Sequence, residues 1–115
     1  MYKVILDTNF LLSCLNFKID FISEIERILN PGYSLNIFEG TLNELKEKKL
    51  GKLALDIIKS KNIKIIKSNN SYVDEDILNL RGNYTIATND KELIKRLKLP
   101  VIRIKQKKYL IIEKV

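Results

Sequence analysis

Short apolar runs alternate along this chain with longer segments in which apolar residues recur every three or four positions. Runs of the first kind are typical of strands buried in a parallel sheet, and the second spacing is typical of amphipathic helices. The runs predict strands at 4–6, 33–38, 63–66, 84–87, 101–104 and 109–112. The periodic segments predict helices at 10–15, 21–29, 41–45, 50–58, 72–80 and 93–97.

The alternation of strands with helices predicts the fold class. Strand–helix–strand units join through right-handed crossovers, which build a largely parallel sheet with helices on both faces. We therefore expect an α/β protein, a three-layer α/β/α sandwich around a central, mainly parallel five-stranded sheet. A turn at 105–108 should bring the last segment, 109–112, back as a short antiparallel edge strand. The length of 115 residues suits a single domain, 1–115, with one core.

Composition narrows the classes of function. The chain contains no His, which excludes Ser-His-Asp and zinc hydrolase chemistry, and its lone Cys14 is expected to be a small core residue. No glycine-rich phosphate loop is present. No apolar run approaches the roughly 18 residues of a membrane span and the N-terminus lacks a signal-peptide pattern, so we expect a cytoplasmic protein without membrane contact. The net charge of +7 favours a polyanionic partner, although lysine-rich solvated surfaces are common.

Four acidic residues lie where a predicted strand passes into a helix. They are Asp7, Glu44, Asp74 and Asp90, one after each of the first four strands. In a parallel sheet these junctions open on the same edge, where ligand sites of open α/β sheets lie. The alternative for each acid taken singly is helix capping, because Asp and Glu favour helix N-termini.

Converging carboxylates repel one another, and a cation between them offsets that repulsion. Oxygen ligands without His or Cys select Mg²⁺ or Mn²⁺, which also bind phosphate oxygens. Such an ion can activate a water molecule for attack on phosphorus. The acidic set therefore suggests a metal-dependent reaction at a phosphate ester.

The residues around these acids resemble the motifs of the PIN-domain nucleases. The four segments occur in the family's order and span nearly the whole chain: Val4-Ile-Leu-Asp7-Thr8-Asn9, Thr41-Leu-Asn-Glu44-Leu45, Val73-Asp74-Glu-Asp-Ile77-Leu78 and Ile86-Ala-Thr88-Asn89-Asp90. The likeness is greatest to small single-domain archaeal PIN proteins and to PIN nucleases of pre-ribosomal RNA processing. Toxins of the VapC type resemble the chain more distantly.

The resemblance implies a strand order of 3-2-1-4-5 and a role for each residue that matches a motif of the family. Asp7, Glu44, Asp74 and Asp90 would bind Mg²⁺ or Mn²⁺ and form the catalytic site. Four neighbouring residues would orient these acids without binding the ion themselves, as outer residues do at metal sites: Thr8, Asn9, Thr88 and Asn89. Asp76 is the alternative to Asp74, because residues 74–76 are consecutive acids.

The function implied is that of a metal-dependent endoribonuclease. It would act in RNA processing, in ribosome biogenesis or as a toxin, alone or as a homodimer, with an antitoxin or ribosome-assembly partner. Lys46 and Lys91, which follow two of the acids, could contact RNA, although solvated helix faces explain such lysines equally well. Two rivals remain: a non-catalytic PIN scaffold that binds RNA or protein, and a receiver-like signalling domain. The second lacks a lysine after the fifth strand, where Pro100-Val-Ile-Arg103 stands.

Overall fold

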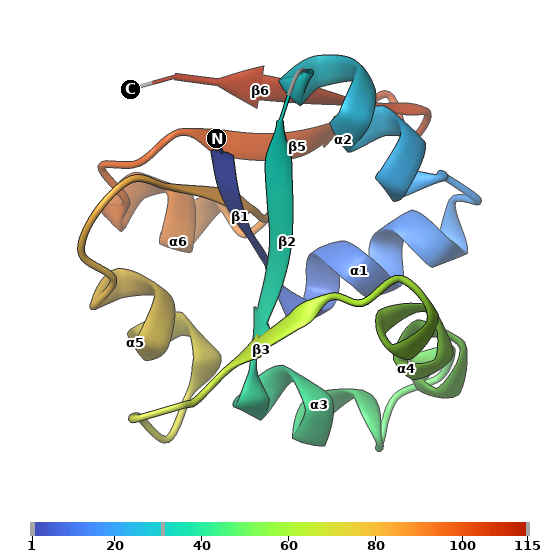
Figure 1. Cartoon of the computed structure of the whole chain (residues 1–115), viewed down its shortest axis with the longest axis horizontal. Coiled ribbons are helices and arrows are strands. Elements are labelled where there is room, and N and C mark those ends of the chain that lie inside the picture. The colour runs from blue at the N-terminus through green and yellow to red at the C-terminus, as the bar shows by residue number, and fades with distance from the viewer. Residues whose placement is uncertain (1, 31, 115) are drawn as a thin grey trace.

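A computed structural model describes residues 2–30 and 32–114, and it contains one mixed β-sheet (Figure 1). The strand order is β3-β2-β1-β4-β5-β6. The first five strands pair in parallel and β6 pairs antiparallel with β5. The strands are β1 (Tyr2–Leu6), β2 (Tyr33–Phe38), β3 (Lys64–Ile66), β4 (Tyr84–Ala87), β5 (Val101–Lys105) and β6 (Tyr109–Glu113). The predicted fold class, strand order and antiparallel edge are therefore confirmed.

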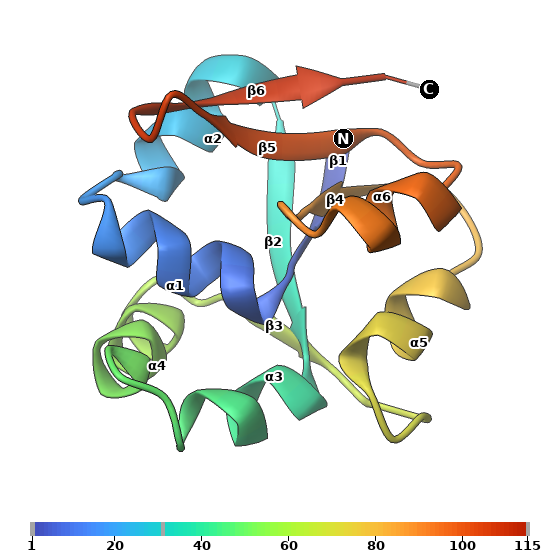
Figure 2. The same cartoon turned by 180° about the vertical axis from the view of Figure 1, so that it is seen from behind.

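Helices cover both faces of the sheet (Figures 1 and 2). They are α1 (Thr8–Asn16), α2 (Phe21–Leu29), α3 (Glu39–Leu45), α4 (Gly51–Ser60), α5 (Val73–Leu78) and α6 (Lys91–Arg96). Helices α1, α2 and α4 pack on one face, and α5 and α6 pack on the other. Among the residues that the structure describes, no helix has the length and apolar character needed to span a membrane.

Strand β1 lies at the centre of the sheet and is buried on both faces. Val4 and Leu6 pack into the larger core beneath α1, α2 and α4, whereas Ile5 packs into the smaller core beneath α5 and α6. All three side chains are fully buried. Successive residues of a strand point to opposite faces, so a strand with a core on each side needs an uninterrupted apolar run. Cys14 is also buried in the larger core, as its sequence context predicted.

Two helices differ from the sequence-based expectation. Helix α5 is six residues long, ending before the predicted 80, and Tyr72 stays 70% exposed. In α4 the apolar stripe is only partly inward, because Leu53 is 48% exposed while Ala54 and Ile58 are buried. The reason lies at the junction with α3, where Gly51 packs directly on the backbone of Leu45. This backbone contact fixes the start of α4 and leaves its first apolar residues at the surface.

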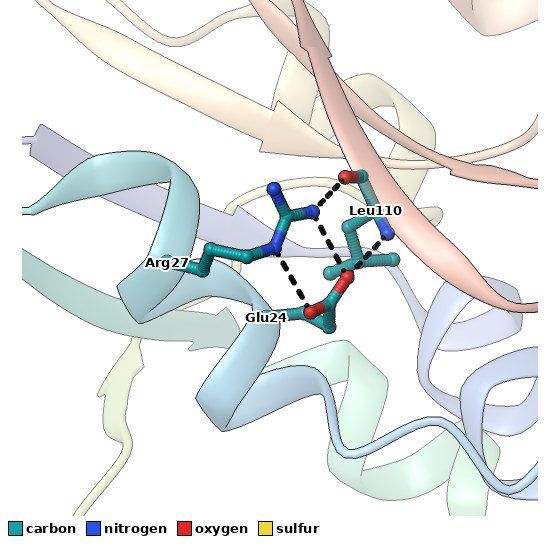
Figure 3. Close-up of polar contacts among 3 residues, drawn as sticks. All are labelled: Glu24, Arg27 and Leu110. Atoms are coloured by element: carbon teal, nitrogen blue, oxygen red, sulfur yellow. Dashed lines mark hydrogen bonds and ion pairs between the residues drawn. The ribbon is translucent and has the colours of Figure 1, made fainter.

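The outer edge of β6 is bound by an ion pair from α2 (Figure 3). Arg27 donates two hydrogen bonds to Glu24, each 3.0 Å long. Arg27 also donates to the carbonyl oxygen of Leu110 at 2.9 Å, while Glu24 accepts from the Leu110 N–H at 3.0 Å. The hydrogen bonds from Arg27 and from Leu110 hold the pKa of Glu24 below its ordinary value. The pair thus joins α2 to the edge strand through both backbone groups of one residue.

Candidate active site

Asp7 follows β1 directly and precedes the first residue of α1. It is only 6% exposed. Its Oδ1 accepts a hydrogen bond from the Thr8 N–H, and its Oδ2 accepts one from the Thr88 hydroxyl, both at 2.9 Å. A capping side chain normally accepts from the second or third residue of its helix. Asp7 reaches only the first, so helix capping alone does not account for a buried carboxylate at this position.

The environment of Asp7 opposes its ionisation. Burial raises the pKa of Asp7 from its ordinary 3.8 to about 6, against the lowering effect of the Thr88 hydrogen bond. The negative charges of Asp74 and Glu44 raise the pKa further. A carboxyl group that is buried among other acids and titrates near neutrality is characteristic of functional sites.

Glu44 is tied to the start of α1 by a threonine. The Thr8 hydroxyl donates to Oε1 of Glu44 at 2.5 Å and lies 3.1 Å from the hydroxyl oxygen of Thr41. Thr8 and Thr41 are buried, whereas Glu44 reaches the surface. Thr41 had no predicted role, but it lies three residues before Glu44 in α3 and therefore on the same helical face. The two threonines set the direction of the Glu44 side chain.

Asp90 and Asp74 come from the opposite face of the sheet. Asp90 caps α6, because its Oδ1 accepts from the N–H groups of Glu92 and Leu93 at 3.0 and 3.2 Å. The Asp90 N–H donates to the Thr88 hydroxyl oxygen at 3.1 Å, so Thr88 touches both Asp7 and Asp90. Asp74 lies in the first turn of α5, and burial together with the charges of Asp90 and Glu44 raises its pKa.

These acids share one edge of the sheet. Asp7, Glu44 and Asp90 follow the carboxyl ends of three parallel strands, and α1, α3, α5 and α6 are arranged around that edge (Figure 2). The mutual effects of the four charges on the pKa values of Asp7 and Asp74 require that they lie near one another. Within 2–30 and 32–114, however, no three acidic or Cys side chains are close enough to form a complete metal site.

Asp76, the alternative third acid, is turned away from this edge. It is 5% exposed, and its Oδ1 accepts from the Asn69 N–H, the Asn70 N–H and the Asn70 side-chain amide at 2.8–3.1 Å. Burial raises its pKa, but these hydrogen bonds outweigh burial and hold the pKa below its ordinary value. Asp76 therefore organises the loop before α5, and Asp74 is the acid that faces Asp90 and Glu44.

The other residues predicted for the site are all exposed. Asn9 is exposed on the first turn of α1, and Lys46 and Lys91 are exposed at the end of α3 and the start of α6. Asn89 does not contact the acids: its Oδ1 accepts from the Ile104 N–H at 3.0 Å and fastens the loop after β4 to β5.

The residues that are brought together suit a hard divalent cation. Every donor is a carboxylate or hydroxyl oxygen, which is the ligand type that Mg²⁺ and Mn²⁺ prefer. Burial raises the pKa values of Asp7 and Asp74, and the charges of neighbouring acids raise them further; Arg96 lowers the pKa of Asp74 but does not outweigh these effects. A cation bound there would relieve the repulsion.

Comparison with known proteins agrees with the arrangement of the fold. Residues 4–107 match the family of PIN-like domains. Ribonuclease VapC4 from Methanocaldococcus jannaschii is 40% identical, over 95% of each chain. The solved structure of the PIN domain endonuclease Utp24 superposes with a TM-score of 0.88 at 27% identity, covering 99% of this chain and 92% of that one. By both the family match and the identity to VapC4, the chain belongs to the PIN-like domain family.

Proposed function

We propose that this protein is a ribonuclease that hydrolyses internal phosphodiester bonds of RNA with Mg²⁺ or Mn²⁺. The observation that carries the proposal is Asp7, a buried carboxylate whose pKa is raised by burial and by the charges of Asp74 and Glu44. The relatives support the reaction class, because one is named a ribonuclease and the other an endonuclease. The absence of His from the chain leaves carboxylates as the natural general-base and metal-binding groups.

Each acid has a distinct role in this proposal. Asp7 and Asp90 hold the ion, because they follow adjacent central strands and share the Thr88 hydroxyl. Glu44 and Asp74 complete the site and orient the attacking water. Thr8 and Thr88 position the carboxylates by hydrogen bonds. A bound Mg²⁺ or Mn²⁺ would supply a polarised phosphate and a more acidic water.

The substrate is proposed to be RNA. The net charge of +7 favours association with a polyanion, and Lys46 and Lys91 stand at the rim of the acidic edge. We propose further that residues 1–115 act in the cytoplasm as one PIN domain, alone or as a homodimer. The biological setting is RNA processing, ribosome assembly, or a toxin held by an antitoxin.

A cleavage assay on single-stranded and structured RNA, with Mn²⁺ or with EDTA, tests the proposal. Wild type should cleave only with the ion. Asp7→Asn and Asp90→Asn keep size and hydrogen-bonding shape, so each should fold but lose activity by orders of magnitude. Glu39→Gln, near the site but without an assigned role, is the matched control and should cleave like wild type.

The same assay separates the two candidate third acids. Asp74→Asn should be nearly inactive. Asp76→Asn should retain cleavage but unfold at a lower temperature, because its carboxylate organises the loop at 69–70. The reverse pattern would move the site by two residues. Activity that survives EDTA and both Asp7→Asn and Asp90→Asn would disprove the proposed mechanism, whereas RNA binding without any cleavage would indicate a scaffold.

A further inference from the structure

A second polar surface adjoins the acidic edge, and we call it the hairpin cleft. It has a volume of about 500 Å³ and is lined by Phe17 after α1, Asn89 and Lys91 beside α6, and Arg103 and Lys107 of β5 and its turn. The lining residues come from three parts of the chain: the end of α1, the start of α6, and β5 with the β5–β6 turn. Three of the eight lining side chains are cationic and none is acidic, so the cleft is basic where the neighbouring edge is acidic.

The cleft begins where the candidate active site ends. Asn89 and Lys91 line the cleft and flank Asp90 on either side in sequence. The hydrogen bond from the Ile104 N–H to Asn89 holds this loop against β5. The acidic edge and the hairpin cleft therefore meet at Asp90.

The cationic side chains of the cleft differ in whether a carboxylate already forms an ion pair with them. Arg103 forms an ion pair with Glu113 at 2.9 Å. Among the described residues, no carboxylate lies within ion-pair distance of Lys91 or Lys107. The Lys107 ammonium instead lies 5.7 Å from the centre of the Phe17 ring. A cation over an aromatic face is held by the ring's negative face, which keeps this charge at the cleft.

The turn that carries Lys107 adopts a conformation that disfavours long side chains. Gln106 and Lys107 both have positive φ angles, 53° and 56°, and the Lys108 N–H bonds to the Lys105 carbonyl at 3.1 Å. Hairpin turns of this kind favour Asn-Gly, because glycine adopts positive φ without steric cost. Residues held in strained conformations cluster at functional sites. The turn fixes the backbone of Lys107 and places its ammonium group near the Phe17 ring.

We propose that the hairpin cleft binds the sugar–phosphate backbone of the RNA strand on one side of the cleaved bond, through Lys91 and Lys107. This inference rests on the proposed ribonuclease function. It adds a surface, the β5–β6 turn, that lies outside the four acidic motifs. Arg103, already paired with Glu113, contributes positive potential and a smaller share of the binding.

The test is the affinity for a short fluorescein-labelled single-stranded RNA, measured by anisotropy in EDTA at several salt concentrations. The double variant Lys91→Gln/Lys107→Asn removes two charges, and Asn tolerates the positive φ of the turn. Each phosphate contact on a single strand contributes about 0.7 to the salt slope. Losing two contacts should therefore lower the slope by about 1.4 and weaken binding by about 25-fold at 0.1 M salt. The control Lys61→Gln/Lys64→Gln removes the same charge beside α4 and β3 and should change affinity less than about twofold.

The inference is overturned if the cleft variant binds with wild-type affinity and slope, or if the control weakens binding equally. Cleavage by the wild-type protein with Mn²⁺, measured in parallel, reports on the proposed function separately. Cleavage that persists while the cleft variant binds normally rejects only the cleft. A wild-type protein that neither binds nor cleaves RNA rejects both proposals.

Discussion

At the scale of single residues, the burial of Asp7 fixes the position of its carboxylate but makes its negative charge unfavourable. Asp7 occupies the end of the central strand, the cap position of α1 and the hydrogen bond to Thr88. The same burial that fixes its geometry disfavours its charge. Strain of this kind is tolerated where function needs a preorganised group. The carboxylate is therefore held in place before any ligand arrives.

The raised pKa of Asp7 predicts a pH dependence of stability in metal-free solution. The pKa of Asp7 in the folded chain, about 6, lies above the ordinary 3.8. Protonated Asp7 therefore makes its full contribution to the free energy of unfolding below about pH 4, and this contribution is lost as the pH rises through 6. The full shift corresponds to at most about 3 kcal/mol. Asp7→Asn should remove this loss and should be more stable than wild type at pH 7 in EDTA.

Urea unfolding in EDTA at several pH values between 4 and 7 measures this difference. The free energy of unfolding of wild type should fall toward pH 7 more steeply than that of Asp7→Asn. Glu39→Gln, which changes an exposed acid, should follow the wild-type curve. Parallel curves for wild type and Asp7→Asn would contradict the burial of an uncompensated charge.

At the scale of elements, the junction between α3 and α4 depends on one glycine. A Cβ added at Gly51 would lie 1.7 Å from the carbonyl oxygen of Leu45, so the backbone must move to accept it. Overpacking of this kind typically costs about 1–3 kcal/mol, and a clash with backbone belongs at the upper end. Gly51→Ala should therefore lower the melting temperature by several degrees.

Gly32→Ala provides the matched control for that substitution. A Cβ at Gly32 would meet nothing within 4 Å. Its melting temperature should stay close to that of wild type, and both values can be measured by circular dichroism. Equal melting temperatures for the two variants would show that α4 can shift freely against α3.

The elements also show what the sequence could predict. The bounds of β2 and β4 match the predicted 33–38 and 84–87. Their apolar residues were sufficient for this, although β2 also contains Ser34 and Asn36 and β4 contains Thr85. The apolar spacing at 50–58 places Leu53 on the apolar face of α4, yet Leu53 is 48% exposed. The contact between Gly51 and Leu45 has no signature in that spacing. Helical periodicity reports which face is apolar, whereas the depth of burial depends on the neighbouring element.

Some features of the candidate site could also be predicted from the sequence, whereas others are seen only in the structure. Strand order predicts the edge to which Asp7, Glu44 and Asp90 belong, because each follows the carboxyl end of a parallel strand. That the four acids form one site stays a prediction. The orienting bond from Thr8 to Glu44 joins residues 36 apart, and its existence depends on side-chain directions that only the packed structure shows. The contact of Lys107 with Phe17 is more remote still and carries no local pattern.

At the scale of the whole molecule, the proposed metal site predicts that ion binding stabilises the fold. An ion that binds only the folded chain stabilises it by mass action, by about 2.7 kcal/mol at a hundred times its dissociation constant. Mn²⁺ should therefore raise the melting temperature of wild type by several degrees. Asp7→Asn should lose most of this gain and Glu39→Gln should keep it. Equal gains for wild type and Asp7→Asn in differential scanning calorimetry would show that the ion binds elsewhere.

The Glu24–Arg27 pair has a consequence for how this molecule can assemble. An edge strand with free N–H and C=O groups is a template onto which another chain can add a strand, the route to both sheet-sharing dimers and fibrils. At Leu110 both groups are already occupied by charged side chains, so an incoming strand would have to displace two charge-assisted hydrogen bonds. Growth of the sheet past β6 is therefore disfavoured at Leu110, and a partner that adds a strand would approach the opposite edge, at β3.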